Sequence, residues 1–273
     1  MAIATESPSR IDGPERIQWL RGFRSLSGLF EVKFRHDRVF EMFMYFAGPA
    51  LRRAFEQVCS DPDGQRLLQQ KPNLLALLDD DEYLASLPPD SLGAAYRDFL
   101  NQHRLDAGVF PSGTVIQPII DQAGWSEDFG YMVQRGTALH DMFHTLGGYG
   151  PDGGGELGNL GFHHGQLDGS WFTGALSALI IAAMPGGTPW RKYRYWREAV
   201  RRGRRAGNLM AAPYEELLTL PLDEVRRRLN VAPTPVAHPA GHFFSAAQIP
   251  FVKRSGKPFE PWIFQPVRTC SQE

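Results

Sequence analysis

Apolar side chains recur every three or four residues along most of the chain, which is the period of an α-helix with one buried face. The pattern is clearest over residues 39–58, 129–143 and 156–184. The alternation of apolar and polar positions that indicates a strand is nearly absent, and no internal repeat is visible. The sequence therefore predicts an all-α fold, a single-domain multi-helix bundle.

The two ends of the chain differ from this helical pattern. Residues 1–35 mix Pro, Gly and Ser with scattered aromatics, and we expect an irregular N-terminal arm that packs on the rest of the protein. We expect the helical domain to span residues 36–232, followed by an irregular C-terminal extension over residues 233–273. The domain should open with two helices, the second beginning at Pro49, since proline suits the first turn of a helix.

Further elements follow from turn residues and helical spacing. Residues 104–120 hold two prolines and two glycines among their β-branched residues, so we expect a loop there. The stretch Trp171 to Met184 is fourteen residues long and stops at Pro185. About twenty residues are needed to span a bilayer, so we interpret it as a buried helix. Other helices are expected over residues 65–70, 74–78, 81–86, 91–100, 190–210 and 217–229.

The composition is that of an ordinary globular protein. In 273 residues, 29 Lys and Arg stand against 30 Asp and Glu, which predicts no general affinity for nucleic acid. Cys59 and Cys270 lie far apart in a chain whose N-terminus has no apolar run, so we expect neither a signal peptide nor a disulfide. We interpret Cys59 as a core residue.

A candidate metal site begins with His140-Asp141-Met142-Phe143-His144, which lies within a helical pattern. Residues four apart share one face of a helix, so the two imidazoles can bind one cation. Six glycines follow within residues 147–155, and they should end the helix and reverse the chain. Glu156 would then open the next helix opposite the two histidines, and the positive end of that helix favours a carboxylate.

The predicted ligands are therefore His140, Asp141, His144 and Glu156. Two nitrogens and two oxygens suit zinc, our first expectation, and also iron, manganese or cobalt, while magnesium stays open. A hydrogen-bonded patch without a metal is the simpler alternative. Metal-dependent phosphohydrolases also use a His-Asp pair and would need roles for His103 and Asp168.

Two further features have both a functional and a structural interpretation. His163 lies seven residues after Glu156, about two helical turns, and it can line the same pocket or simply be a core histidine. The stretch 190–210 is strongly basic on one side and aromatic on the other. Such a helix can contact an anionic membrane surface, although a solvated face with core behind it is the commoner arrangement.

The arrangement H-D-x-x-H, eleven residues and then Glu resembles the signature of the coenzyme Q biosynthesis protein four family. Residues 87–96 are similar to the family's L-P-x-x-S-L-G-x-x-Y segment. Further similarity lies at residues 62–68, 202–209 and 214–226, so that the resemblance covers about residues 40–232. The chain departs from the family pattern at Gly136–Leu139, at His163 and at Tyr214.

This resemblance implies a protein that is peripheral to the membrane holding quinones. The protein would bind the cytoplasmic face of that membrane. In a eukaryote it would bind the matrix side of the mitochondrial inner membrane. The implied activity is metal-dependent removal of the C1 carboxylate of a polyprenylated 4-hydroxybenzoate, thought to be oxidative. Implied partners are this prenylated aromatic substrate, other ubiquinone-biosynthesis proteins and a second copy of the chain.

Two alternatives to this activity remain. A non-catalytic scaffold would bind prenylated intermediates for neighbouring enzymes and use the metal only for structure. A relative of the family could also have moved to another prenylated or polycyclic substrate, in keeping with the departures near Gly136 and His163.

Overall fold

The computed structural model describes residues 16–25, 36–103, 113–150, 153–167, 169, 171–172, 174–175, 177–178 and 188–234. Within these ranges there is no strand, and one isolated bridge pairs Ser91 with Pro221. The helices are α1 (Trp19–Ser25), α2 (His36–Ser60), α3 (Pro62–Gln70), α4 (Leu74–Leu78), α5 (Asp81–Ser86), α6 (Leu92–His103), α7 (Gly113–Ala123), α8 (Glu127–Gly147), α9 (Gly153–Gln166), α11 (Pro189–Arg205), α12 (Tyr214–Leu217) and α13 (Leu222–Arg228). The predicted all-α class is confirmed.

Several helices begin where the sequence supplies a capping side chain. The Asp61 carboxylate accepts hydrogen bonds from the first backbone N–H groups of α3, which would otherwise have no partner. The Ser91 hydroxyl accepts one from the N–H of Ala94, 3.1 Å away, as the sequence predicts. The same role is taken in α4, α5 and α8 by Asn73, Asp80 and Ser126.

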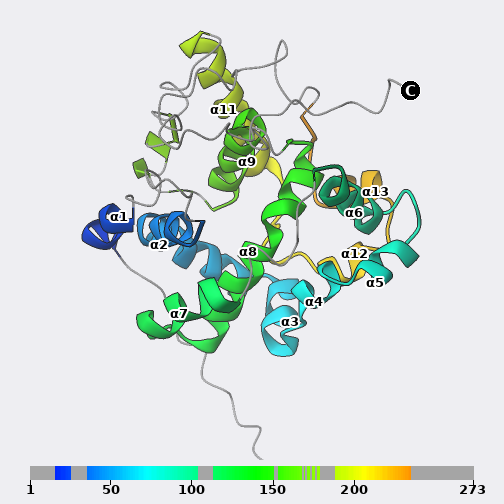
Figure 1. Ribbon diagram of the computed structural model, residues 1–273, viewed down its shortest axis with the longest axis horizontal. Helices are drawn as coiled ribbons and strands as arrows, with labels where there is room; N and C mark the ends of the chain where they lie inside the picture. Colours follow the sequence, from blue (N-terminus) through cyan, green and yellow to red (C-terminus); the bar gives the residue numbers. More distant parts are fainter. Residues whose placement is uncertain are drawn as a thin grey trace, which may run out of the picture.

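Helix α8 runs through the middle of the molecule (Figure 1) and packs against α2, α3, α4, α6, α7 and α9. Its side chains Phe129, Leu139 and Phe143 are fully buried. Each such side chain contributes roughly 1.5–3 kcal/mol relative to an exposed position. The segment that carries the candidate ligands is therefore part of a central helix with a well-buried face.

Among the described helices, α9 and α11 share the most extensive contact, and glycines line it. A Cβ atom added at Gly161 would lie 3.1 Å from the Cβ of Ala199. A Cβ at Gly165 would overlap the carbonyl oxygen of Val200, and one at Gly203 would overlap that of Phe162. The backbones of α9 and α11 thus touch directly. This contact holds α9, which also packs on α8, in place.

Two predictions for the N-terminal part were wrong. The arm is not wholly irregular, since α1 forms within it and packs on α2, with the Gln18 N–H donating to the Tyr45 carbonyl at 3.1 Å. The expected two opening helices are a single helix that continues through Pro49. A proline inside a helix costs about 3 kcal/mol. Buried residues on both sides, such as Phe46 and Phe55, pack into the core and offset that cost.

Further corrections concern residues 104–229. Residues 113–123 form α7 in place of the expected loop, because Ile116, Ile119 and Ile120 share one helical face that is buried in the core. The expected helix over residues 217–229 is shorter, since α12 ends at Leu217 and α13 begins only at Leu222. Trp171, expected in a buried helix, is exposed.

The remaining predictions on organisation stay open. Residues 26–35, at the end of the expected arm, and residues 235–273, which make up most of the expected C-terminal extension, lie outside the described residues. Cys59 packs against the core as expected, while Cys270 is also outside that part of the chain. Among the described residues, no helix combines the length and apolar character that crossing a bilayer requires.

Candidate metal centre

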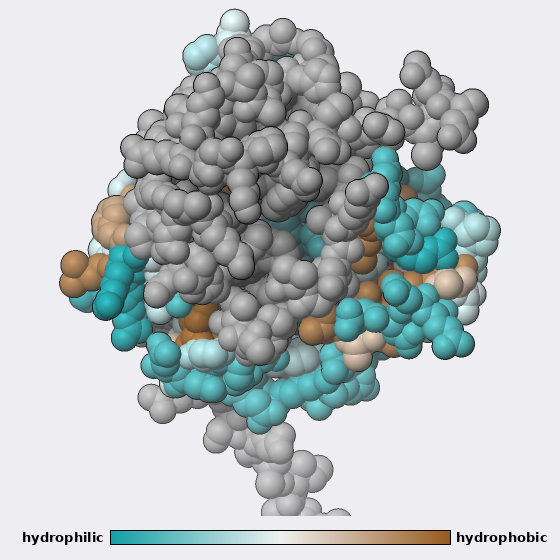
Figure 2. All heavy atoms as spheres, viewed as in Figure 1, coloured by the Kyte–Doolittle hydropathy of each residue, from teal (hydrophilic) through white to brown (hydrophobic). Residues whose placement is uncertain are grey.

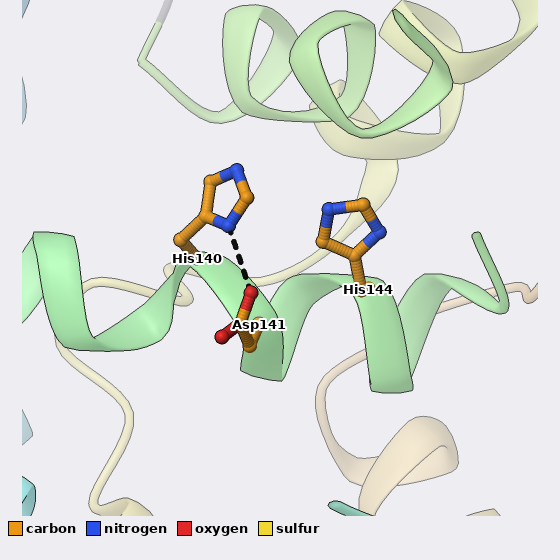
Figure 3. Close-up of side chains that lie close together, drawn as sticks. All are labelled: His140, Asp141 and His144. Carbon is orange, nitrogen blue, oxygen red and sulfur yellow. Dashed lines mark hydrogen bonds and ion pairs between the residues drawn. The ribbon is translucent and has the colours of Figure 1, made fainter. Parts of the chain in front are cut away.

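His140, Asp141 and His144 lie near the C-terminal end of α8. Figure 3 shows the two imidazoles projecting from the same side of the helix and the Asp141 carboxylate reaching toward the His140 ring. The imidazole centroids are 5.0 Å apart. One ligand atom from each of the three residues lies within 4.8 Å of the others. The predicted sharing of one face is confirmed.

The glycine turn brings Glu156 to this group. Gly148, with φ of 72°, ends α8 in the left-handed conformation, which costs glycine no strain. Gly155 lies so close to the backbone of Gly150 that no side chain would fit. Helix α9 then places Glu156 in its first turn, with Oε2 3.4 Å from Nε2 of His144 and 3.7 Å from Nε2 of His140.

Hydrogen bonds determine which His144 nitrogen is available to a ligand. Its Nδ1 lies 3.1 Å from the Tyr149 carbonyl oxygen, which can only accept, so Nδ1 carries the hydrogen. In the neutral ring Nε2 then presents a lone pair. This atom is buried and has no hydrogen-bond partner, while the nearest carboxylate is that of Glu156. Two acceptors thus face each other, an arrangement that a bound cation would stabilise.

Asp141 orients His140 in the same way. Its Oδ1 lies 3.0 Å from Nδ1 of His140. Burial raises the pKa of Asp141, but the hydrogen bond from His140 and the charges of His140 and His144 outweigh it, and the net pKa is lowered. The carboxylate is therefore ionised and accepts from Nδ1, which leaves Nε2 of His140 to face Glu156.

The field around His140 attracts positive charge. Burial lowers the pKa of this imidazole, but the hydrogen bond to Asp141 and the charges of Glu156 and Asp141 outweigh it and raise the net pKa. The same field would attract a metal ion. Two imidazole nitrogens and carboxylate oxygens fit zinc, iron, manganese or cobalt, whereas magnesium prefers oxygen ligands. The residues present therefore fit a divalent transition metal.

His163 lies beside this group, as a residue of the same pocket would. Its ring stacks on His140 with centroids 5.7 Å apart and lies 4.5 Å from the Phe143 ring. Nε2 of His163 is buried without a hydrogen-bond partner. Burial, followed by the charges of His140 and His144, lowers the pKa of this imidazole well below its usual value. The ring is therefore neutral, and its nitrogen is available to a ligand.

Supporting residues that the sequence analysis did not identify hold the group in place. The buried Asn159 amide donates to the His140 carbonyl at 3.3 Å and ties α9 to α8. Asn159 lies three residues after Glu156 and therefore on the same face of α9, so the sequence could have identified it as a residue near the group. Arg226 donates to the carbonyls of Leu146 and Thr145 at 3.0 and 3.2 Å, and no sequence signal connects these distant segments.

The structure does not test the phosphohydrolase alternative. The side chain of His103 and the whole of Asp168 lie outside the described residues.

Comparisons with known proteins identify a single family. The family model described as Coenzyme Q (ubiquinone) biosynthesis protein Coq4 matches residues 20–235. The mitochondrial ubiquinone biosynthesis protein COQ4 homolog of Rattus norvegicus is 30% identical over 214 residues, which cover 74% of this chain and 73% of the relative. The mitochondrial COQ4 protein of Arthroderma otae is 31% identical, with 74% and 72% covered.

A solved structure has the same fold. It is a crystal structure from Nostoc punctiforme of a protein described as a candidate ubiquinone biosynthesis protein. The two superpose with a TM-score of 0.53 and 19% identity, over 78% of this chain and 98% of the other. At this identity the likeness shows the fold alone.

Proposed function

Since the chain belongs to the Coenzyme Q (ubiquinone) biosynthesis protein Coq4 family, we propose that it removes the C1 carboxylate of a polyprenylated 4-hydroxybenzoate during ubiquinone synthesis. A divalent metal, with zinc as our first expectation, would be held by His140, Asp141, His144 and Glu156. One observation supports this most strongly: Nε2 of His144 and Nε2 of His140 lie 3.4 and 3.7 Å from the same carboxylate oxygen, Oε2 of Glu156.

The partial exposure of the group favours a catalytic role over a structural one. The His144 side chain is 1% exposed, whereas those of His140 and Glu156 are 25% and 32% exposed. Structural zinc sites are closed, while catalytic sites keep a position for substrate. The group is thus anchored on one side and accessible on the other, as binding of a substrate carboxylate requires.

Each residue has a distinct role in this proposal. A bound divalent ion would supply a Lewis acid that binds the substrate carboxylate and stabilises charge as carbon dioxide leaves. Asp141 and the Tyr149 carbonyl hold the two imidazole rings in the tautomer that directs Nε2 toward the ion. The neutral His163 ring would hydrogen-bond a hydroxyl of the aromatic substrate through Nε2, which has no partner within the described part of the protein.

The location and partners also belong to the proposal. The two relatives above are named as mitochondrial. We expect this chain to be peripheral to the quinone-holding membrane, on the matrix side in a eukaryote or on the cytoplasmic face in a bacterium. There it would meet its prenylated substrate and other ubiquinone-biosynthesis proteins, and it would form a homo-oligomer.

Complementation combined with metal analysis tests the proposal. A host that lacks its own family member should regain ubiquinone with the wild-type chain and not with a His144→Ala variant. Purified wild type should hold about one equivalent of metal, and His144→Ala almost none. The control is His164→Ala, which removes an imidazole from α9 outside the group and should keep the metal. Failure of well-expressed wild type to restore ubiquinone would refute the proposal.

The scaffold alternative makes a different prediction. If the metal is only structural, a His163→Phe variant, which keeps a ring against Phe143, should restore ubiquinone as well as wild type. If His163 contacts the substrate, the same variant should keep its metal and lose most of the activity.

A further inference from the structure

Four large apolar side chains are exposed together on one side of the protein. They are Trp19, Leu20 and Phe23 of α1 and Trp171, and we refer to them as the aromatic patch. Leu20 is 89% exposed and Trp171 is 74% exposed. The Trp19 ring lies 6.0 Å from that of Phe23 and 6.5 Å from that of Trp171, so the exposed groups are contiguous.

The patch is seated on two further aromatic side chains, one half-buried and one buried. Behind it, the Phe172 ring lies 4.5 Å from the Trp19 ring, and the buried Phe46 ring of α2 lies 5.5 Å from that of Phe23. Gly22, on the inner face of α1, lets the helix lie directly on the Phe46 ring. These contacts hold α1 against α2. The exposed side chains of the aromatic patch on α1 are therefore held in place by a helix that is packed on the core.

Positive charge borders the patch. The described segment 16–25 carries Arg16, Arg21 and Arg24 and has no acidic residue. The Arg21 guanidinium lies 5.7 Å from the centre of the Tyr45 ring. In Figure 2 apolar atoms project at the left edge of the molecule, where α1 lies in Figure 1, with hydrophilic atoms immediately beside them.

We infer that the aromatic patch is the surface by which the protein binds an anionic lipid bilayer. Tryptophan rings favour the membrane–water interface, and basic residues next to them are attracted to anionic headgroups. Apolar side chains such as Leu20 would enter the boundary between headgroups and acyl chains. The inference rests on the proposed function, because a polyprenylated substrate resides in a membrane and must be collected there.

The assignment differs from the functional interpretation that the sequence allows for residues 190–210, in which that basic helix contacts the membrane. In α11 much of the aromatic side packs on α9, where Tyr195 and Trp196 are buried. Trp190 and Tyr193 remain exposed at its beginning. The two surfaces can therefore be separated by substitution.

Co-sedimentation with vesicles tests the inference directly. Wild type should bind phosphatidylcholine vesicles that contain phosphatidylglycerol, and binding should weaken as salt rises. Leu20→Gln removes an exposed apolar group without changing charge and should weaken binding about tenfold. Its matched control is Trp190→Gln on α11, which should bind like wild type.

A second pair of variants isolates the charge. Arg24→Gln should weaken binding about fivefold on anionic vesicles and leave weak binding to pure phosphatidylcholine unchanged. Arg227→Gln, which removes an exposed charge from α13, is the control and should have no effect. If Leu20→Gln binds like wild type, or if Trp190→Gln shows the tenfold loss instead, the assignment to the aromatic patch is overturned.

Two additional measurements separate this inference from its rivals. If Leu20→Gln turns an oligomer into a monomer in analytical ultracentrifugation and keeps vesicle binding, the patch is an interface between copies and the inference fails. Metal content and decarboxylation are measured on the same variant with a short-chain substrate in detergent, and both should equal wild type. Failure of the proposed chemistry would thus appear in wild type while vesicle binding persists.

Discussion

Replacing Glu156 with Gln should change the stability of the metal-free and metal-bound protein in opposite directions. When the His144 ring of the metal-free protein is neutral, the Glu156 carboxylate faces its buried Nε2 lone pair at 3.4 Å, acceptor against acceptor. A glutamine amide can donate a hydrogen bond to that nitrogen. A hydrogen bond of this kind contributes about 1 kcal/mol, which corresponds to a rise in melting temperature of about 2–4 °C for a protein of this size.

The metal response should be lost in the same variant. At a free ion concentration one hundred times the dissociation constant, wild type gains about 2.7 kcal/mol, or roughly 5–10 °C. If the neutral amide weakens binding a hundredfold, the gain at the same concentration falls to about 0.4 kcal/mol, or roughly 1 °C. The order of melting temperatures therefore reverses between chelator and metal.

Differential scanning calorimetry in chelator and in excess zinc measures both effects. Glu82→Gln on α5 is the control, since it makes the same chemical change at an exposed position and should alter stability by less than about 0.5 kcal/mol in either condition. A Glu156→Gln protein that melts below wild type in chelator would show that the two acceptors do not oppose each other. One that responds to zinc as wild type does would show that Glu156 is not a ligand.

Three further outcomes are expected. Gly165→Ala should lose about 1–3 kcal/mol in urea denaturation, because its methyl group meets the backbone of α11, whereas Gly136→Ala in α8 meets only the flexible end of a methionine and should be neutral or stabilising. Arg135→Met should lose about 3–5 kcal/mol by the same assay, since it leaves a largely buried carboxylate without its cation; a loss under 1 kcal/mol would contradict this. Asp141→Asn should weaken zinc binding at least tenfold in a competition titration with a chelating dye, since the His140 ring loses the carboxylate that orients it; unchanged affinity would exclude both a ligand and an orienting role.

The candidate site was predictable because its main parts are local in sequence. His140 and His144 share a face through helix geometry alone, and the glycines between Gly147 and Gly155 leave the chain few ways to return. The position of Glu156 opposite the histidines followed from those two facts. Asn159, one turn further along α9, could have been predicted by the same reasoning.

Other features depended on contacts between distant segments. Helix α7 forms although its residues favour a loop locally, because three isoleucines on one face are buried in the core. Pro49 sits inside a helix because apolar residues on both sides of it share one core. The pairing of Arg226 with the end of α8 joins residues 80 apart, and no periodic pattern carries such information. Local rules failed where tertiary burial outweighed them.

The end of α8 is completed by residues that are synthesised long after it. Arg226 binds the carbonyls of Thr145 and Leu146, and the Thr234 N–H donates to the Gly147 carbonyl at 2.7 Å. The turn that these contacts secure also supplies the Tyr149 carbonyl that fixes the His144 ring. A nascent chain that has not yet emerged as far as residue 234 therefore lacks the contacts that support the candidate ligands. Under the proposed function, a metal would therefore be acquired late, after translation has passed the candidate ligands by some ninety residues, and it would be taken up by a nearly finished fold.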